Sequence, residues 1–201
     1  MLKAAVQLPA TIGDVGEYLA DVTALEAAGA DTIWLDDTAL DPWIVLGAMA
    51  AVTHRIGLGC RLTSMREWSS SRLGHSVATL QTLSRGRTVV ALPELGNVSD
   101  HIAVLRAAGS KILTTESKHE SADGVILAVE SADEIADAVG THVEVWAAIG
   151  APPDRDAWAS ARSAYEGVGA TGVIVPWSDR IVDLLRNSEP DDRSDLLMST
   201  G

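Results

Sequence analysis

The chain has 201 residues, 47% of them hydrophobic, and carries 28 acidic residues against 15 Lys plus Arg, for a net charge of −13. This length suits one domain with a sizeable core, and the acidic charge argues against nucleic acid or an anionic membrane as a partner. No apolar run reaches the roughly 18 residues of a membrane span, and the first residues lack the pattern of a signal peptide. A single cysteine, Cys60, excludes an internal disulfide. We therefore expect a cytoplasmic protein that acts on a small-molecule substrate.

Short apolar runs predict eight β-strands along the chain. They cover Lys3 to Leu8, Thr32 to Asp36, Ile56 to Leu62, Thr88 to Leu92, Lys111 to Thr114, Gly124 to Ala128, Val143 to Ile149 and Gly172 to Val175.

Amphipathic or capped segments between these runs predict seven helices. They cover Asp14 to Ala28, Pro42 to Thr53, Ser70 to Leu83, Ser99 to Ala108, Ser131 to Val139, Asp154 to Val168 and Ser178 to Arg186. Asp14 and Asp41 are typical helix N-caps, and Pro42 is favoured in a first turn. Only the polar segment from Thr115 to Asp123 has no clear helix, so we expect an irregular connection there.

One unit occurs four times: a helical run that ends in glycine and is followed within a few residues by a strand. The copies span Ala24 to Leu35, Val104 to Thr114, Ile135 to Trp146 and Ala164 to Val175. Glycine is favoured just past a helix end because it enters the left-handed conformation without a Cβ clash. Helix and strand alternating at this density are typical of an α/β protein with a parallel sheet.

This pattern predicts a compact (β/α)₈ barrel over residues 1–187, followed by an acidic, frayed tail over residues 188–201. A doubly wound open sheet is the alternative. No Gly-x-Gly-x-x-Gly follows the first strand, where Leu8 to Gly13 reads LPATIG, so that nucleotide fingerprint is absent.

Four segments resemble the bacterial luciferase-like flavin and deazaflavin oxidoreductases, in the order that this family shows. Ala27 to Trp34 is similar to its "A-E-x-x-G-F-D" motif, and Asp41-Pro42 with Ala48 to Gly59 to its "D-P … A-A-x-T-x-R-I-x-L-G". Thr79 to Arg87 resembles "T-L-D-x-L-S-x-G-R", and Ala122 to Ile126 resembles its "A-D-G" strand start. The resemblance covers somewhat over half of the chain.

The resemblance implies a barrel oxidoreductase or monooxygenase, often a homodimer, that binds flavin mononucleotide (FMN) or a deazaflavin coenzyme at its C-terminal face. The chain also departs from the family. Thr38 stands where many coenzyme-dependent members carry a histidine, Ala91 to Gly96 replaces a glycine-rich turn, and the segment between Leu92 and Ala122 is short. These departures leave open a second interpretation, a non-catalytic luciferase-like barrel that acts as a subunit or binding module. A third is an unrelated barrel enzyme that acts on a phosphorylated small molecule.

The end of the third predicted strand is the first candidate for binding a cofactor. It reads Gly59, Cys60, Arg61, Leu62, and in the family this position lies against the coenzyme ring. Gly59 would allow close approach of the backbone, and the planar guanidinium of Arg61 suits an anion or an electron-rich ring edge. The alternatives are a salt bridge from Arg61 to Asp36 or Asp37, and a buried apolar role for Cys60.

Two carboxylates are candidates for catalysis. Asp37 follows the second strand and Glu94 follows the fourth, so either lies at the C-terminal face, where it could move a proton or orient a ring nitrogen. The alternatives are that Asp37 caps a turn and that Glu94 is an exposed loop residue.

Trp146, Gly150, Trp177 and Ser178 complete the predicted coenzyme site. The indoles of Trp146 and Trp177 offer flat stacking surfaces, although Trp34 and Trp146 are equally suited to the core. Ser178 is predicted to open the last helix, whose free N–H groups, together with Gly150, would bind phosphate. The histidines and Cys60 show no metal-ligand spacing, so no metal is expected.

Overall fold

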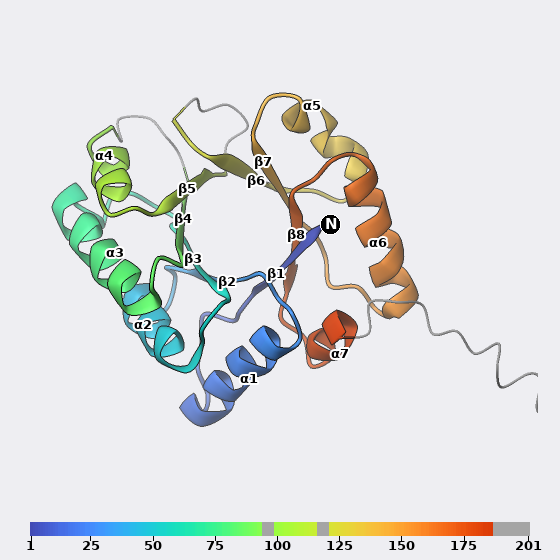
Figure 1. The fold of residues 1–201 in the computed structure, drawn as a ribbon, viewed down its shortest axis with the longest axis horizontal. Coiled ribbons are helices and arrows are strands. Elements are labelled where there is room, and N and C mark those ends of the chain that lie inside the picture. The colour runs from blue at the N-terminus through green and yellow to red at the C-terminus, as the bar shows by residue number, and fades with distance from the viewer. Residues whose placement is uncertain (94–98, 116–120, 187–201) are drawn as a thin grey trace, which may run out of the picture.

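The structure is a computed structural model, and it describes residues 1–93, 99–115 and 121–186. Eight parallel strands form one closed barrel in chain order, and β1 pairs with β8 to close the ring (Figure 1). The predicted barrel is therefore confirmed, and the open sheet is excluded. The strands are β1 (Lys3–Gln7), β2 (Thr32–Asp36), β3 (Gly57–Arg61), β4 (Thr88–Leu92), β5 (Lys111–Thr114), β6 (Gly124–Ala128), β7 (Glu144–Ala148) and β8 (Gly172–Pro176).

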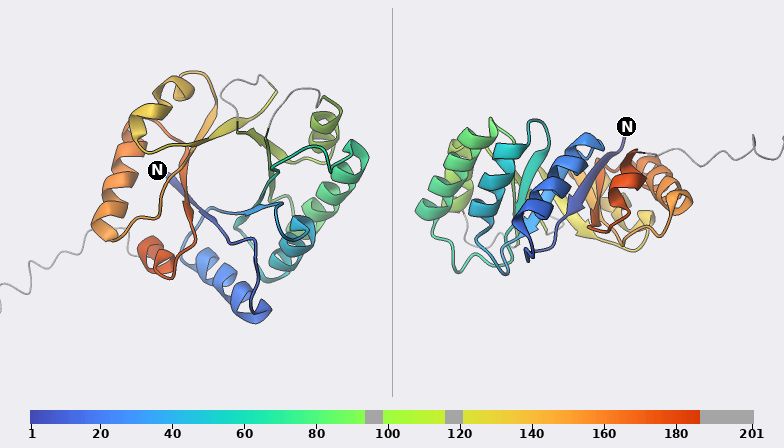
Figure 2. Two further views of the ribbon diagram at one scale, coloured as in Figure 1. Left: turned by 180° about the vertical axis from the view of Figure 1, so that it is seen from behind. Right: turned by 90° about the horizontal axis from the view of Figure 1, so that it is seen from below.

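Helices surround the barrel on its outer side, as the views in Figure 2 show. They are α1 (Val15–Ala27), α2 (Pro42–Val52), α3 (Ser70–Ser84), α4 (Ser99–Ala107), the 3₁₀ turn η1 (Ala132–Ile135), α5 (Ala136–Val139), α6 (Arg155–Gly167) and α7 (Ile181–Arg186). Within the described ranges, none of them is long and apolar enough to cross a membrane. Between β5 and β6 the described residues form no helix, and residues 116–120 lie outside the description, as do Glu94 and the predicted tail.

Two helices differ from the prediction. The single helix predicted from Ser131 is divided into the turn η1 and the four-residue α5. The last helix begins at Ile181, not at Ser178, and its first turn is closed by a bond from the Ile181 N–H to the Ser178 carbonyl at 3.0 Å.

A glycine follows the helix in all four copies of the repeated unit, and in three of them it has a positive φ angle. Gly29, Gly109 and Gly169 have φ angles of 90°, 75° and 91°, where a side chain would be strained. Gly140 is the exception, with a φ of −72°. The short α5 leads into a turn in which the Thr141 and His142 N–H groups both bond to the Ala138 carbonyl, so no left-handed residue is needed there.

A polar residue just before three of the strands bonds to the backbone of the preceding strand. Asp31 accepts the Ala4 N–H at 2.8 Å, Asp123 accepts the Ile112 N–H at 2.8 Å, and Thr171 accepts the Val145 N–H at 2.9 Å. Each bond satisfies an N–H at the N-terminal end of the barrel that would otherwise lack a partner. The "A-D" pairs of two family-like segments thus have a structural role.

Two charged side chains fasten the connection between α2 and β3. One carboxylate oxygen of Glu26 accepts the backbone N–H groups of His54, Arg55 and Ile56 at 2.6–2.9 Å. Burial alone would raise the pKa of Glu26, but these bonds and the charge of Arg55 outweigh it and hold the pKa below its usual value. Arg87 donates to carbonyls at the end of α2, including that of Thr53 at 3.1 Å.

The interior of the barrel is filled by two tryptophans, each packed over a glycine of the next strand. Trp34 is paired in register with Gly59, and Trp146 with Gly172. A Cβ atom on either glycine would lie 2.5 Å from an indole carbon. The indoles share a buried cluster with Ala5, Ala91, Leu113, Ile126 and Ile174, separate from the larger core between strands and helices. Trp34 and Trp146 therefore lie in the core, which was the alternative interpretation of these two residues.

These contacts predict that alanine lowers the free energy of unfolding at Gly59 and Gly172 but not at Gly167. Gly59→Ala and Gly172→Ala each place a methyl group against an indole, and we expect each to lower the free energy of unfolding by about 1–3 kcal/mol. Gly167→Ala, whose added Cβ meets nothing within 4 Å, is the matched control and should be neutral or slightly stabilising. Urea titration followed by circular dichroism measures all three, and equal stabilities would contradict the packing described.

Candidate functional site

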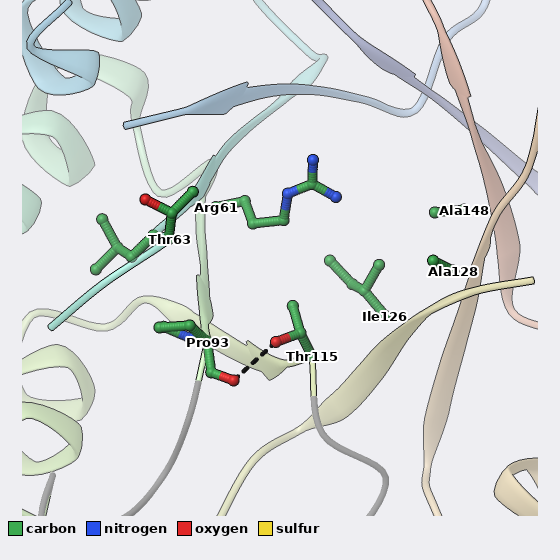
Figure 3. Close-up of a pocket in the computed structure, with 8 residues that line it drawn as sticks. Arg61, Thr63, Pro93, Thr115, Ile126, Ala128 and Ala148 are labelled. Atoms are coloured by element: carbon green, nitrogen blue, oxygen red, sulfur yellow. Dashed lines mark hydrogen bonds between the residues drawn. The ribbon is translucent and has the colours of Figure 1, made fainter. Parts of the chain in front are cut away.

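A pocket of about 290 Å³ opens at the C-terminal mouth of the barrel, near the lower end of the ~300–1,000 Å³ of small-molecule sites. Its walls come from five consecutive strands, β3 to β7, or the residues just after them (Figure 3). The lining residues are Arg61, Leu62, Thr63, Pro93, Thr115, Ile126, Ala128 and Ala148. This is the face at which (β/α)₈ barrels carry their sites.

Arg61 is the charged group of this pocket, and its side chain extends from β3 into the mouth (Figure 3). Its Nε and Nη2 atoms donate to the two carboxylate oxygens of Asp36 on β2, at 2.7 and 2.8 Å. These bonds raise the pKa of the guanidinium, which remains charged. Among the described residues Nη1 has no hydrogen-bond partner, so it is free to donate to a ligand. The salt bridge expected as an alternative role for Arg61 is present and leaves this edge available.

Asp37 fastens the loop that forms one wall of the pocket. One carboxylate oxygen accepts the backbone N–H and the hydroxyl of Thr63 at 2.7 and 2.6 Å. The other oxygen accepts the indole N–H of Trp68 at 3.0 Å. Since both oxygens are engaged within the protein, Asp37 holds the pocket wall, and its predicted catalytic role stays a prediction.

Trp68 connects this loop to the surrounding helices. Its ring lies edge-on to that of Trp43 at 5.9 Å, and the Arg72 guanidinium lies 5.5 Å from its centroid. The Trp68 carbonyl is 2.7 Å from the His101 Nε2 atom on α4. The wall of the pocket is therefore anchored to α2 and α3 through the Trp68 side chain and to α4 through the Trp68 carbonyl.

The four residues predicted at the end of β3 lie on two faces of the sheet. Arg61 and Leu62 line the pocket. Gly59 points into the barrel, where Trp34 occupies the space beside it. Cys60 is fully buried in the core between strands and helices, and burial raises the pKa of its thiol well above the usual value. Cys60 thus has the buried apolar role expected as its alternative.

Four further predicted residues, all within the described ranges, do not line the pocket. Trp146 lies deeper inside the barrel, with its indole N–H donating to Glu144 at 3.3 Å. Gly150 is exposed, and Trp177 packs partly against the outer core. Ser178 precedes α7 by a short turn, so the predicted helix start at this residue is wrong. Glu94 lies outside the described residues.

A second, smaller cavity of about 110 Å³ lies at the opposite end of the barrel. Trp34 and Trp146 line it, together with Lys111 and Glu144, whose charged atoms are 2.6 Å apart. Neither indole lines the mouth pocket. The two tryptophans therefore separate the two cavities.

Six of the eight residues that line the pocket were not predicted from the sequence. Thr63, Pro93, Thr115, Ile126, Ala128 and Ala148 line it without carrying a motif. For β6, the alternation of side chains along a strand offered a signal, because Ile126 and Ala128 are two residues apart and face the same side. Small apolar residues at strand ends bear no reactive group, so the sequence alone does not indicate that they line a pocket.

The family model for the luciferase-like monooxygenases matches residues 3–97. This range includes β1 to β4, and with them Asp36, Asp37, Arg61 and Thr63. An uncharacterised protein of Mycobacterium tuberculosis and one of Mycobacterium bovis are each 45% identical over 53 residues. Those alignments cover 26% of this chain, and the chain spans 19% of each relative.

Solved structures share the fold over almost the whole chain. The coenzyme F420-dependent tetrahydromethanopterin reductase of Methanopyrus kandleri has a TM-score of 0.69 at 11% identity, covering 92% of this chain and 96% of its own. An F420-dependent secondary alcohol dehydrogenase gives 0.70 at 10%, covering 94% and 99%. The tryptophan synthase α-subunit of Pyrococcus furiosus gives 0.67 at 13%, covering 98% and 96%. Such low identities establish the barrel fold alone.

The bonds of Asp37 predict that this residue controls the order of the pocket wall. We expect Asp37→Ala to speed amide hydrogen exchange over residues 63–68 and to lower the free energy of unfolding by about 1–3 kcal/mol, because the indole N–H of the buried Trp68 and two donors of the exposed Thr63 lose their acceptor. Asp37→Asn keeps one acceptor oxygen and should have a smaller effect. Exchange in this loop that is as slow in Asp37→Ala as in the wild type would refute the role given to Asp37.

Proposed function

The luciferase-like family model matches residues 3–97, and on that basis we propose that this chain is an oxidoreductase of the luciferase-like monooxygenase type. In this proposal a deazaflavin or a flavin such as FMN binds at the C-terminal mouth, beside the site of a small-molecule substrate. The observation that carries the proposal is the mouth pocket itself, in which a charged guanidinium with one free edge lies over an apolar wall.

The pocket suits the ring of such a coenzyme. Leu62, Ile126, Ala128 and Ala148 give an apolar surface, and a flat heterocycle gains from apolar contact on its faces. The free Nη1 of Arg61 can donate to a ring oxygen or nitrogen at the edge. Asp36 balances the charge of Arg61, so the pocket does not require an anionic ligand.

The phosphate-bearing part of the coenzyme has no comparable site among the described residues. In this proposal the pocket of about 290 Å³ holds the ring system, and the rest of the coenzyme extends beyond the mouth. Gly150, Trp177 and Ser178 follow β7 and β8 on that side of the barrel, and they stay predictions for this part. The six-residue α7 begins too late and is too short to supply the N-terminal phosphate site first expected.

When bound, a flavin or deazaflavin supplies hydride chemistry, and the residues of the chain bind and orient it. Arg61 holds a ring edge, Ile126 and Leu62 exclude water from one side, and Asp37 keeps Thr63 in the wall through two hydrogen bonds. These are positioning roles, which set where a substrate meets the ring.

A second candidate function is the non-catalytic barrel. One observation favours it: Trp34 and Trp146 fill the interior, and Trp146, which the sequence suggested as a wall of the coenzyme site, lies below the mouth. A barrel of this kind would keep the family's packing without its coenzyme.

Titration of the purified protein with FMN and with a deazaflavin coenzyme, followed by fluorescence quenching, tests the proposal. We expect one of them to bind with one molecule per chain. Arg61→Met should weaken that binding about 10- to 100-fold, since a hydrogen bond from a charged donor contributes about 1.5–3 kcal/mol. Arg186→Met removes an equal charge from an exposed position on α7 and should leave the affinity unchanged.

The absence of binding by either coenzyme at high micromolar concentration would favour the non-catalytic barrel. Equal affinities of the wild type and Arg61→Met would show that a coenzyme binds elsewhere.

A further inference from the structure

Polar side chains lie inside the N-terminal end of the barrel, below the cluster around Trp34 and Trp146. On each of four strands, a polar residue precedes a member of this buried cluster by two positions. Because side chains alternate along a strand, residues two apart face the same side, so these four side chains face the barrel interior. They are Lys3 on β1, Thr32 on β2, Lys111 on β5 and Glu144 on β7.

Glycines at this end of the barrel make room for the polar side chains. Gly57 begins β3 and Gly124 begins β6. A Cβ on Gly57 would lie 2.8 Å from the Thr32 hydroxyl oxygen, and one on Gly124 would lie 2.6 Å from the Glu144 Cβ. The cavity of about 110 Å³ lies among the four polar side chains, and its apolar walls are Trp34, Val89, Leu113 and Trp146.

Three side chains of this cavity have hydrogen-bond donors that are not used within the protein. Thr32 is only 8% exposed, yet its hydroxyl has no hydrogen-bond partner among the described residues. In the same part of the chain, the Lys3 ammonium has neither a hydrogen bond nor a carboxylate within 4 Å. Lys111 donates one of its three protons to Glu144, at 2.6 Å. These three groups can therefore donate to a ligand.

The two carboxylates of the cavity already accept hydrogen bonds from the protein. Glu144 accepts the Lys111 ammonium with one oxygen and the Trp146 indole N–H with the other, at 2.6 and 3.3 Å. Asp31 lies at the exposed rim, where water screens its charge, and one of its oxygens accepts the Ala4 N–H at 2.8 Å. A ligand that brings acceptor atoms and a negative charge fits the donors that remain.

We propose that this cavity binds a small monocarboxylate of about the size of acetate. Its carboxylate accepts hydrogen bonds from Lys3, Lys111 and the Thr32 hydroxyl, and its carbon chain lies against the indoles of Trp34 and Trp146. A water molecule takes about 30 Å³ in the liquid, so a cavity of about 110 Å³ has room for about four non-hydrogen atoms. The apolar walls favour a carboxylate over an inorganic anion, which has no apolar part.

This proposal does not rest on the proposed oxidoreductase function, because the cavity lies at the opposite end of the barrel from the mouth pocket. None of the residues that line one of the two spaces lines the other. Binding of acetate and binding of a coenzyme can therefore succeed or fail separately.

Titration of the ¹⁵N-labelled full chain with sodium acetate at pH 7, followed by NMR, tests the proposal. We expect the indole N–H signals of Trp34 and Trp146 to shift and to saturate, while the amide signals of residues 63–68 at the mouth stay unchanged. Sodium chloride at the same ionic strength is the reference, because it supplies an anion without a carboxylate. Shifts that are equal with chloride, or that do not saturate, would overturn the proposal.

Two substitutions locate the bound carboxylate. Lys3→Met should raise the dissociation constant of acetate about tenfold, because a hydrogen bond from a charged donor is lost. Thr32→Val should raise it about fivefold, without lowering the free energy of unfolding in the absence of acetate, since its buried hydroxyl has no partner to lose. Arg66→Met removes an equal charge from an exposed residue of the mouth loop and is the matched control, with unchanged affinity.

Circular dichroism verifies that each variant is folded. Affinities for acetate that are equal in the wild type, Lys3→Met and Thr32→Val would overturn the proposed site.

Inorganic phosphate tests the chemical class of the ligand. We expect phosphate to bind more weakly than acetate in the same NMR titration, because its oxygens would lose water against the indoles and Leu113. Tighter binding of phosphate than of acetate would assign the cavity to an inorganic anion and overturn the proposal of a carboxylate.

Discussion

Two indoles packed over two glycines fill the inside of the barrel and decide where a ligand can bind. Trp34 fits against Gly59 and Trp146 against Gly172, each across one pair of neighbouring strands. With alanines at other inward positions, such as Ala5 and Ala91, two large rings can fill the interior. Because the centre is filled, the mouth pocket is separate from the cavity at the opposite end of the barrel, and a coenzyme ring is confined to the mouth.

The residues that the family model matches serve two different ends of the barrel. Glu26, Asp31 and Arg87 bind backbone groups near the N-terminal ends of the strands, where barrels gain stability. Asp37 and Arg61, which end or follow β2 and β3, build the mouth pocket. A family match over residues 3–97 therefore includes residues that stabilise the barrel, and only the residues at the mouth bear on the proposed function.

The barrel could be predicted from the sequence because apolar runs, helix caps and glycines all indicated the same alternation of helices and strands. The strands of the structure lie within about a residue of their predicted limits. The last helix was placed too early because Ser178 has the chemistry of a cap but bonds through its carbonyl to Ile181. The site was harder to predict. Arg61 could be predicted as a binding residue because its guanidinium can bind a ligand, whereas Ala128 and Ala148 line the pocket only because of their position in the barrel. The depth of Trp146 follows from its neighbour Gly172, and a single sequence does not reveal such a pair.

A crystal structure of the protein with a deazaflavin coenzyme bound would show where the ring lies. We expect the ring at the mouth, in contact with Arg61 and Ile126, while Trp34 and Trp146 remain packed over Gly59 and Gly172. A ring found between the two indoles, or an interior from which either indole has moved away, would contradict this expectation.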